Sequence, residues 1–327
     1  MKRMAALLLA GLLLVSGALA ADDDAIGLYT PLDEAQETEL AEAAERILDE
    51  ILLDDMTDGE KALALHDWLV THCGYSVTLY RDMAYGALVQ GAAICRGYAH
   101  GYEYLAQAAG LDSIYTFSVP LLHAWTLTEL DGSYYCIDPT WDDNHYERIG
   151  FVSHRHCMFS TANEQATSHY GEDTALIAGG GIYETAPWRD AVTQVIFDDD
   201  YMYFITRALD LVRCGRESWE CETLYTIADS WPGFYEDYDT TLPAPATGLE
   251  KIGGRLWFNT PYAILSIRPN GKDVRTALET DGAEGFICGI AQRDGKLVWS
   301  VSKTVKTLQY DLCEGTVRGR RLTVDCE

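Results

Sequence analysis

The fold is decided by one stretch of the chain, residues 123–138, which reads HAWTLTELDGSYYCID. Its centre, Asp131-Gly132, is a strong signal for a two-residue β-hairpin turn. The flanking residues, 124–130 and 133–138, are rich in aromatic and β-branched side chains. Both flanks are therefore predicted to be strands of one antiparallel hairpin.

The predicted turn also fixes which residues lie opposite one another. With two turn residues, the numbers of paired residues add up to 263, so Trp125 faces Asp138. His123 lies two positions from Trp125 and shares its face of the sheet. Asp138 is then the diagonal neighbour of His123, about 7–8 Å away between backbones. A slip of one pair would put them directly opposite, so in both registers the carboxylate can hold a ring N–H of the imidazole.

Three helices are predicted before this hairpin. The first begins at Thr30–Asp33, with Thr30 as the capping residue and Pro31 in the first turn. The second begins at Thr57 and ends at Cys73, and the third runs over 94–109. A further strand is predicted over 114–119. Helices followed by an antiparallel sheet indicate an α+β domain.

Cys95 falls in the first turn of the third predicted helix. There the helix dipole and the unpaired backbone N–H groups favour a thiolate over a thiol. His123 can serve as the base of this thiol, and Asp138 can orient His123. Alone, each residue has an ordinary explanation: a disulfide, a surface histidine, an aspartate that caps a turn. Together they predict a thiol catalytic triad.

Three segments of the chain resemble the motifs of the transglutaminase-like superfamily, in that family's order. They are the nucleophile motif Cys95–Ala99, the histidine motif His123–Trp125 and the aspartate motif Tyr135–Asp142. Two further segments are similar to its leading helix and its closing segment: His66–Leu69, and 151–170 with Phe159 and His169. The resemblance covers roughly residues 35–172.

The resemblance implies a papain-like fold and acyl transfer through a thioester on Cys95, with His123 and Asp138 in the roles described. The oxyanion would be bound by the backbone N–H of Cys95, with Gln90 as a possible side-chain donor. No cofactor and no metal site are expected. Whether water or an amine accepts the acyl group is left open, so a peptidase, an amidase and a protein-glutamine acyltransferase are all consistent with the motifs.

The rest of the chain is predicted to be all β. Three hairpins, at 195–204, 249–258 and 290–299, each combine a strand, a turn rich in Asp or Gly, and a strand with aromatic residues. Such hairpins indicate either propeller-like repeats or a sandwich. The predicted domains are a catalytic domain at 21–175, a linker at 176–190 and a β-rich domain at 191–327.

Residues 1–20 are predicted to be a secretory signal peptide cleaved near Ala20. Lys2 and Arg3 precede an uncharged apolar run that is too short to span a bilayer, and Ala18–Ala20 fits a cleavage site. We therefore expect a secreted protein without a spanning helix. In an oxidising compartment, the nine cysteines allow up to four disulfides and leave at least one thiol free.

The charge of the chain limits its partners. The net charge is −27, and removal of Lys2 and Arg3 would make it −29. Such a chain is repelled by nucleic acid and by anionic membranes. The resemblance to the transglutaminase-like superfamily implies a protein or peptide substrate, for example at a cell surface. The main prediction is a secreted thiol enzyme that acts on protein or peptide amides. The alternative is a catalytically silent extracellular binding or adhesion module.

Overall fold

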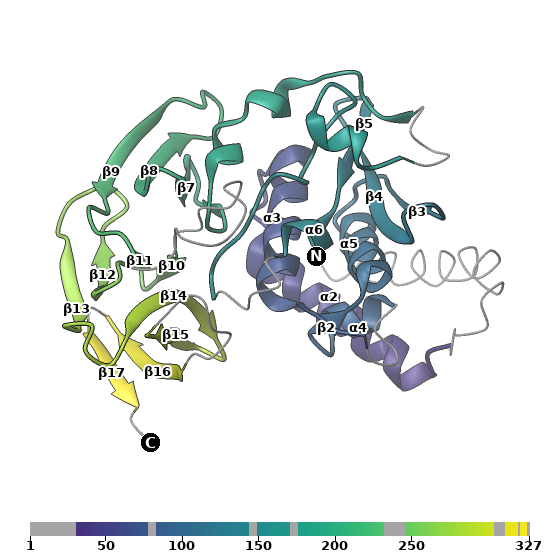
Figure 1. Cartoon of the computed structure of the whole chain (residues 1–327). Helices are drawn as coiled ribbons and strands as arrows, with labels where there is room; N and C mark the ends of the chain where they lie inside the picture. Colours follow the sequence, from purple (N-terminus) through teal and green to yellow (C-terminus); the bar gives the residue numbers. More distant parts are fainter. Residues whose placement is uncertain are drawn as a thin grey trace. The chain divides into compact units, whose positions relative to one another are not determined.

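The computed structural model describes residues 31–77, 83–143, 149–170, 176–231, 246–303, 311–319 and 321–325 (Figure 1). The predicted signal peptide, residues 1–20, lies outside these ranges. The chain divides into two compact units, and each is described here by itself. The first unit contains residues up to Thr140 together with Cys157–Gly181, and the second contains Trp141–His156 and Ile182–Glu327.

Helices form the first half of the first unit. They are α2 (Glu34–Ile51), α3 (Asp58–His72), α4 (Ala84–Leu88) and α5 (Cys95–Ala108). The α3 start is as predicted, because the Thr57 side chain and Glu60 form a reciprocal capping box. The predicted Thr30 cap of the first helix is wrong. Asp33 caps α2 instead, because Gln36 can return its hydrogen bond; Thr30 lies outside the described residues.

Helix α5 is held against its neighbours by large buried side chains. It packs against α3, α4 and two strands of the sheet. Tyr98 donates a hydrogen bond to the carbonyl of Cys73 at 2.9 Å, and Tyr102 donates one to the carbonyl of Ala62 at 3.2 Å. Gly101 lets α4 approach closely, since a Cβ there would lie 2.9 Å from the Ala87 Cβ. These contacts fix the position of the helix whose first residue is Cys95.

The sheet of the first unit has three antiparallel strands in the order β3 (Ser113–Ser118), β4 (His123–Leu130) and β5 (Ser133–Ile137). Leu127 pairs with Cys136 and Thr126 with Ile137, so the predicted register is confirmed. Positive φ angles at Asp131 (54°) and Gly132 (77°) are those of a type I′ turn. A short parallel pair, β1 (Gly74–Tyr75) and β2 (Ala92–Ala93), precedes α5.

The second unit contains three four-stranded antiparallel sheets, each with its strands in chain order. The sheets consist of β6 (Ile196–Phe197), β7 (Tyr201–Ile205), β8 (Asp210–Gly215) and β9 (Cys221–Thr226); β10 (Leu249–Ile252), β11 (Arg255–Asn259), β12 (Ala263–Ile267) and β13 (Arg275–Glu279); and β14 (Phe286–Arg293), β15 (Lys296–Ser302), β16 (Asp311–Arg318) and β17 (Arg321–Asp325). Each predicted hairpin forms the first two strands of one sheet. The predicted α+β class with a C-terminal all-β region is therefore confirmed. The choice between a propeller-like arrangement and a sandwich stays a prediction.

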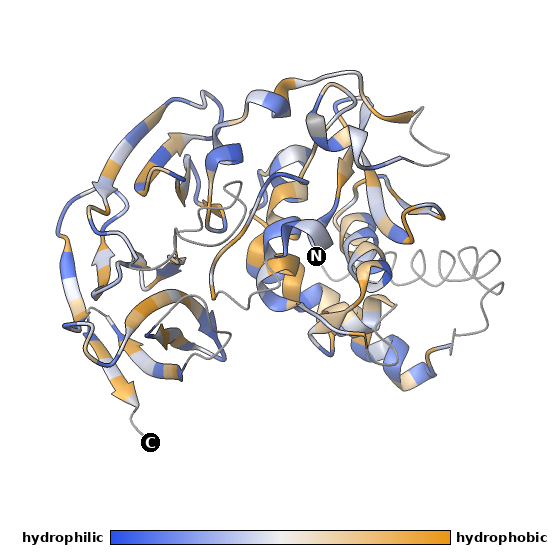
Figure 2. Ribbon diagram, viewed as in Figure 1, coloured by the Kyte–Doolittle hydropathy of each residue, from blue (hydrophilic) through white to orange (hydrophobic). Residues whose placement is uncertain are grey.

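Apolar side chains join these sheets in sequence. One cluster, which includes Tyr203, Leu211 and Phe258, connects the first sheet to the second, and another, which includes Trp257 and Trp299, connects the second to the third. Figure 2 shows hydrophobic segments in orange along strands of this unit, and in the first unit on helix α3. Each sheet is thus stabilised by the burial of apolar surface against the next one.

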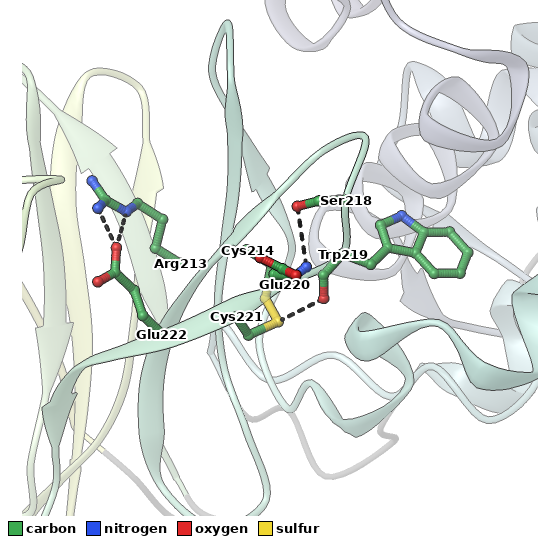
Figure 3. Close-up of a disulfide and its surroundings, with 7 residues drawn as sticks. All are labelled: Arg213, Cys214, Ser218, Trp219, Glu220, Cys221 and Glu222. Atoms are coloured by element: carbon green, nitrogen blue, oxygen red, sulfur yellow. Dashed lines mark hydrogen bonds and ion pairs between the residues drawn. A yellow bond between two sulfur atoms is a disulfide. The ribbon is translucent and has the colours of Figure 1, made fainter.

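A disulfide links Cys214 and Cys221 across strands β8 and β9 (Figure 3). The two cysteines are direct cross-strand partners, as are Arg213 and Glu222, which form an ion pair beside them. Cys95 and Cys136 are free cysteines, which agrees with the expectation of at least one free thiol.

Short 3₁₀ helices and one further α-helix complete the described elements. They are α6 (Pro139–Asp142), η2 (Glu164–Thr167), η4 (Ile182–Thr185) and η5 (Pro187–Asp190). No helix among the described residues is long and apolar enough to cross a membrane. The predicted domain and linker boundaries stay predictions.

Candidate active site

Cys95 is the first residue of α5 and is mostly buried, with 9% of its surface exposed. Within the described chain, no side chain caps this helix: Ile94 occupies the N-cap position, and an isoleucine has no hydrogen-bonding group. The first N–H groups of any α-helix have no acceptor within the helix. They are therefore oriented toward the region around the Cys95 sulfur, where they favour negative charge.

The chain enters α5 through a tight turn of small residues. Gly91 has a φ of +66°, and a Cβ there would meet the carbonyl oxygen of His72 at 3.3 Å. Hydrogen bonds from Gly74 N to Gly91 O (3.0 Å) and from Ser76 N to Ala93 O (2.9 Å) hold this turn beside β1. The glycine is therefore needed for the backbone path that leads to Cys95.

His123 and Asp138 meet as the hairpin geometry predicts. The Nε2 atom of His123 lies 2.6 Å from Oδ2 of Asp138, and both side chains are buried. Because Nε2 is engaged by the carboxylate, Nδ1 is the nitrogen available to the thiol of Cys95. His123 is indeed hydrogen-bonded to the Cys95 side chain as well.

The pKa of His123 is strongly raised. Burial acts to lower this pKa, but the hydrogen bonds to Asp138 and Cys95 and the charges of both groups outweigh it. The result is a pKa of about 9, against an ordinary value of 6.5. At neutral pH the protonated imidazolium is therefore the favoured form of His123.

Asp138 is completely buried and accepts hydrogen bonds from Thr140, His123 and His169. Its Oδ1 accepts from the backbone N–H of Thr140 at 3.0 Å, so it also caps the turn that begins α6. Its Oδ2 accepts from His123 and from Nε2 of His169 at 2.8 Å. Burial acts to raise the pKa of Asp138, yet the bonds and charges of the two histidines hold it well below its usual range.

His169 is the site residue to which the sequence motifs assigned no role. It follows η2 and is buried, with Trp125 and Phe159 against its ring at centroid distances of 4.9 and 4.8 Å. It lies 31 residues beyond Asp138, outside the hairpin whose register could be counted. The sequence signal for His169 is its place in residues 151–170, which resemble the closing segment of the superfamily.

Other residues near the site have mainly structural environments. Cys136 packs with Trp125 and Leu127 on one face of the sheet, while Ala124 on the other face packs against Cys95. Burial, followed by the negative charge of Asp138, raises the pKa of the Cys136 thiol far above its usual range. Cys136 is thus a poor nucleophile, and the role of Gln90 in an oxyanion hole stays a prediction.

Nε2 of His123, Nε2 of His169 and a carboxylate oxygen of Asp138 lie within 4.8 Å of one another, a spacing that also occurs in metal sites. Here both imidazole nitrogens already make hydrogen bonds to the same oxygen, at 2.6 and 2.8 Å. The spacing of these three residues is therefore accounted for by their hydrogen bonds, without a metal ion.

Residues 45–139 match the family model of the transglutaminase-like superfamily. The predicted resemblance is confirmed, and this segment is a transglutaminase-like core that contains Cys95, His123 and Asp138. No protein with a curated description matches the chain.

Solved structures similar to parts of the chain are only distantly related. A provisionally assigned cysteine protease from Cytophaga hutchinsonii is 19% identical over 38% of this chain and 44% of its own, with a TM-score of 0.27. A TGase is 13% identical over 38% of this chain and 37% of its own, with a TM-score of 0.28. PorZ, a surface component of the type-IX secretion system of Porphyromonas gingivalis, is 12% identical over 62% of this chain and 19% of its own, also with a TM-score of 0.28. The chain spans less than half the length of each, and scores this low carry no argument about function.

Proposed function

We propose that this protein is an exported thiol enzyme that acts on protein or peptide amides through a thioester on Cys95. The observation that supports the proposal is one hydrogen-bonded series: a free thiol at an uncapped helix N-terminus, bonded to His123, which is bonded to buried Asp138. These are the three parts that nucleophilic catalysis by a thiol requires.

In the first half of the reaction, the Cys95 thiolate attacks the carbonyl carbon of an amide. The backbone N–H of Cys95 stabilises the oxyanion that forms. His123 then gives its Nδ1 proton to the nitrogen that leaves, and the C–N bond breaks to form a thioester and a free amine. Asp138 keeps Nε2 of His123 protonated and holds the ring in this orientation.

In the second half, an acceptor attacks the thioester and transfers a proton to His123. Attack by water yields a carboxylic acid and completes hydrolysis, whereas attack by an amine yields a new amide and completes transamidation. The thiolate leaves and the initial state is restored. The same three residues serve both reactions, so the acceptor decides between a peptidase and an acyltransferase.

Export is proposed on two grounds. The first is the signal-like sequence at residues 1–20, and the second is the Cys214–Cys221 disulfide, a bond that persists in oxidising compartments. A protein at a cell surface is the class of substrate that this location would supply.

The test is selective alkylation of Cys95. We expect an iodoacetamide probe at neutral pH to label Cys95 in the folded protein and to leave Cys136 unlabelled. The Cys95→Ala variant should lose the label, and the matched Cys136→Ala variant should keep it. An unreactive Cys95 would count against an enzyme and in favour of a silent binding module.

Mass spectrometry after incubation with a peptide library then identifies the acceptor. Cleaved peptides would indicate peptidase activity, conversion of Gln to Glu would indicate an amidase, and peptides joined to an added amine would indicate transamidation. The Cys95→Ala variant is the control for each product.

A further inference from the structure

The first sheet of the second unit shows where a disulfide forms on these strands. Cys214 and Cys221 lie opposite one another on the third and fourth strands of that sheet (Figure 3). The adjacent residues, Gly215 and Glu220, are joined by a backbone hydrogen bond of 3.1 Å. Hydrogen-bonded and non-hydrogen-bonded pairs alternate along an antiparallel ladder. The two cysteines are therefore a non-hydrogen-bonded pair, the kind whose side chains lie closer together.

The third sheet has a cysteine at a comparable place. Its third and fourth strands are β16 and β17, and Cys313 lies on β16. The register of these strands is regular from the turn that joins them to the pair Glu314–Asp325. Cys326 directly follows Asp325 in the sequence and lies outside the described residues. One further step along the same register leads to Cys313 on one strand and to Cys326 on the other.

The turn determines the type of this next pair. Only Gly319 and Arg320 separate Arg318 from Arg321, which pair across the turn. The carbonyl of the first residue of such a turn accepts the N–H of the fourth, so this pair is hydrogen-bonded. The position of Cys313 is an odd number of steps from Arg318 and therefore belongs to a non-hydrogen-bonded pair. Its Cα atoms are expected about 4.5 Å apart, a distance that a disulfide spans.

The face of the strands also favours two apolar partners at this position. Cys313 and Leu322 both pack against the apolar cluster that contains Trp299. Between them on this face, a Cβ at Gly315 would lie 2.8 Å from Leu322 Cδ1 and 3.3 Å from Trp299 Cζ3. Residues two and four positions apart on a strand share a face. The register thus assigns Cys326 to the face on which Leu322 and Cys313 pack.

The fold leaves few other partners for Cys313 in the second unit. Cys288 lies in the same sheet, but on β14, and β15 separates β14 from β16. Two strand spacings amount to about 9.5 Å. Cysteines whose Cα atoms are more than about 7 Å apart cannot be bridged without movement of the backbone. Cys214 and Cys221 are already bonded to each other. Among the cysteines of this unit, Cys326 is the partner that the register supplies.

We propose that Cys313 and Cys326 form a second cross-strand disulfide, which links the last residues of the chain to the third sheet. The two thiols lose two protons and two electrons as the S–S bond forms. A disulfide oxidant of an oxidising compartment takes them up and is reduced to two thiols. Within its sheet β17 is an edge strand that pairs only with β16, so the bond would keep the far end of this ladder closed. The inference holds whether or not Cys95 is catalytic.

The first experiment maps the bond in the full-length protein. The protein is equilibrated with mixtures of reduced and oxidised glutathione, blocked with N-ethylmaleimide and digested with trypsin without reduction. Cleavage after Lys and Arg places Cys313 alone in peptide 307–318 and Cys326 alone in peptide 322–327. We expect these two peptides to be found linked at the most oxidising ratio and to separate on reduction. The Cys214–Cys221 bond in the same digest is the control for oxidation.

Two results would overturn the proposal. One is recovery of both peptides as separate maleimide adducts at the most oxidising ratio. The other is a bond from Cys326 to a different cysteine, in either unit. Because the measurement involves no substrate, neither result bears on the proposed enzyme.

The second experiment compares urea unfolding of wild type and Cys326→Ala, a change next to the end of the chain. Under oxidising conditions we expect the second unit of wild type to unfold at the higher urea concentration. Under reducing conditions the two midpoints should coincide, because the bond is then absent from both proteins. An equal difference under both conditions would mean that the Cys326 side chain acts by packing alone, and would contradict the disulfide.

Discussion

His123 reaches Asp138 diagonally across the β4–β5 hairpin, with 2.6 Å between Nε2 and Oδ2. The two residues lie beyond the last regular pair of the hairpin, Thr126 and Ile137. Their meeting therefore depends on a register that the two-residue turn sets at the opposite end. The distance between the catalytic candidates is a consequence of local turn chemistry.

Replacing Asp138 by Asn should abolish most activity. The neutral amide cannot accept hydrogen bonds from both histidines as the charged carboxylate does. The pKa of His123 should therefore fall, and its ring should be held less firmly. In serine-protease triads the equivalent change lowers kcat on the order of 10⁴-fold, and we expect a loss of similar size in peptide turnover. The control is Asp131→Asn, at a turn position that Asn accepts well. Full turnover by Asp138→Asn would remove Asp138 from the mechanism.

Stability should fall at alkaline pH because of His123. Its pKa is about 9 in the folded protein against an ordinary 6.5, so protonation stabilises the fold. This contribution is fully present below about pH 6.5 and is lost as the pH rises through about 9, by at most about 3 kcal/mol.

Urea unfolding of the first unit between pH 6 and 10 measures this loss. The Cys95→Ala variant lacks one of the groups that raise the pKa of His123, so the stability of this variant should begin to fall at a lower pH than that of wild type. Identical pH profiles for wild type, Cys95→Ala and His123→Gln would contradict the assignment.

Substitution of Leu122 should stabilise the folded protein. It is 77% exposed and has a φ of +50°, a left-handed conformation that is unfavourable for leucine. Asn has a similar size and tolerates this region, so Leu122→Asn should raise the free energy of unfolding by up to about 1 kcal/mol. Val119→Asn, in the same loop at a similarly exposed position that is not among the residues with positive φ, should change it by less than about 0.5 kcal/mol. Equal effects in thermal unfolding would show that backbone strain is not the cause.

Gly248→Ala should destabilise the second unit. A Cβ at this position would lie 2.1 Å from the carbonyl oxygen of Ile290, which is backbone and cannot rotate away. We expect a loss of about 2–3 kcal/mol, as for other overpacked sites. Gly179→Ala, in the first unit, is the control for loss of a glycine without a close approach, since within 4 Å its Cβ would meet the Thr161 hydroxyl at 3.9 Å. Similar denaturation midpoints for both variants would refute the close approach.

Reduction of the Cys214–Cys221 disulfide should lower the stability of the second unit without abolishing the reactivity of Cys95. The bond closes a short loop, with a sequence separation of 7, so the chain-entropy contribution is about 2.5 kcal/mol. The double variant Cys214→Ala/Cys221→Ala should unfold at lower urea than wild type and keep its Cys95 label. Loss of the label would show that the disulfide supports the thiol site as well.

The predictable parts of the structure are those set by local chemistry. Asp131-Gly132 determines the hairpin and its register, and Thr57 with Glu60 determines the start of α3. The start of α2 was misplaced because two overlapping capping patterns compete there. The reciprocal one, with Asp33, is used. Local competition of this kind shifts a boundary without changing the element.

The remaining features depend on contacts between distant segments. His169 meets Asp138 after a gap of 31 residues, and no periodicity or turn rule spans that distance. The three aromatic hairpins are recognisable in the sequence, but they cover only the first two strands of each sheet. In the first sheet, β9 is largely exposed, so it lacks the apolar signal that marks a buried strand.

The division of the chain at Trp141–His156 has a consequence for how the protein is made. This segment belongs to the second unit, yet it is synthesised before Cys157–Gly181, which completes the first. During translation, residues 141–156 of the second unit therefore leave the ribosome before the first unit is complete. They can pack into the second unit only after residues beyond Ile182 have been synthesised. For the same reason, no single cut in the polypeptide separates the two units: a fragment that ends at Gly181 carries all of the first unit together with residues 141–156 of the second.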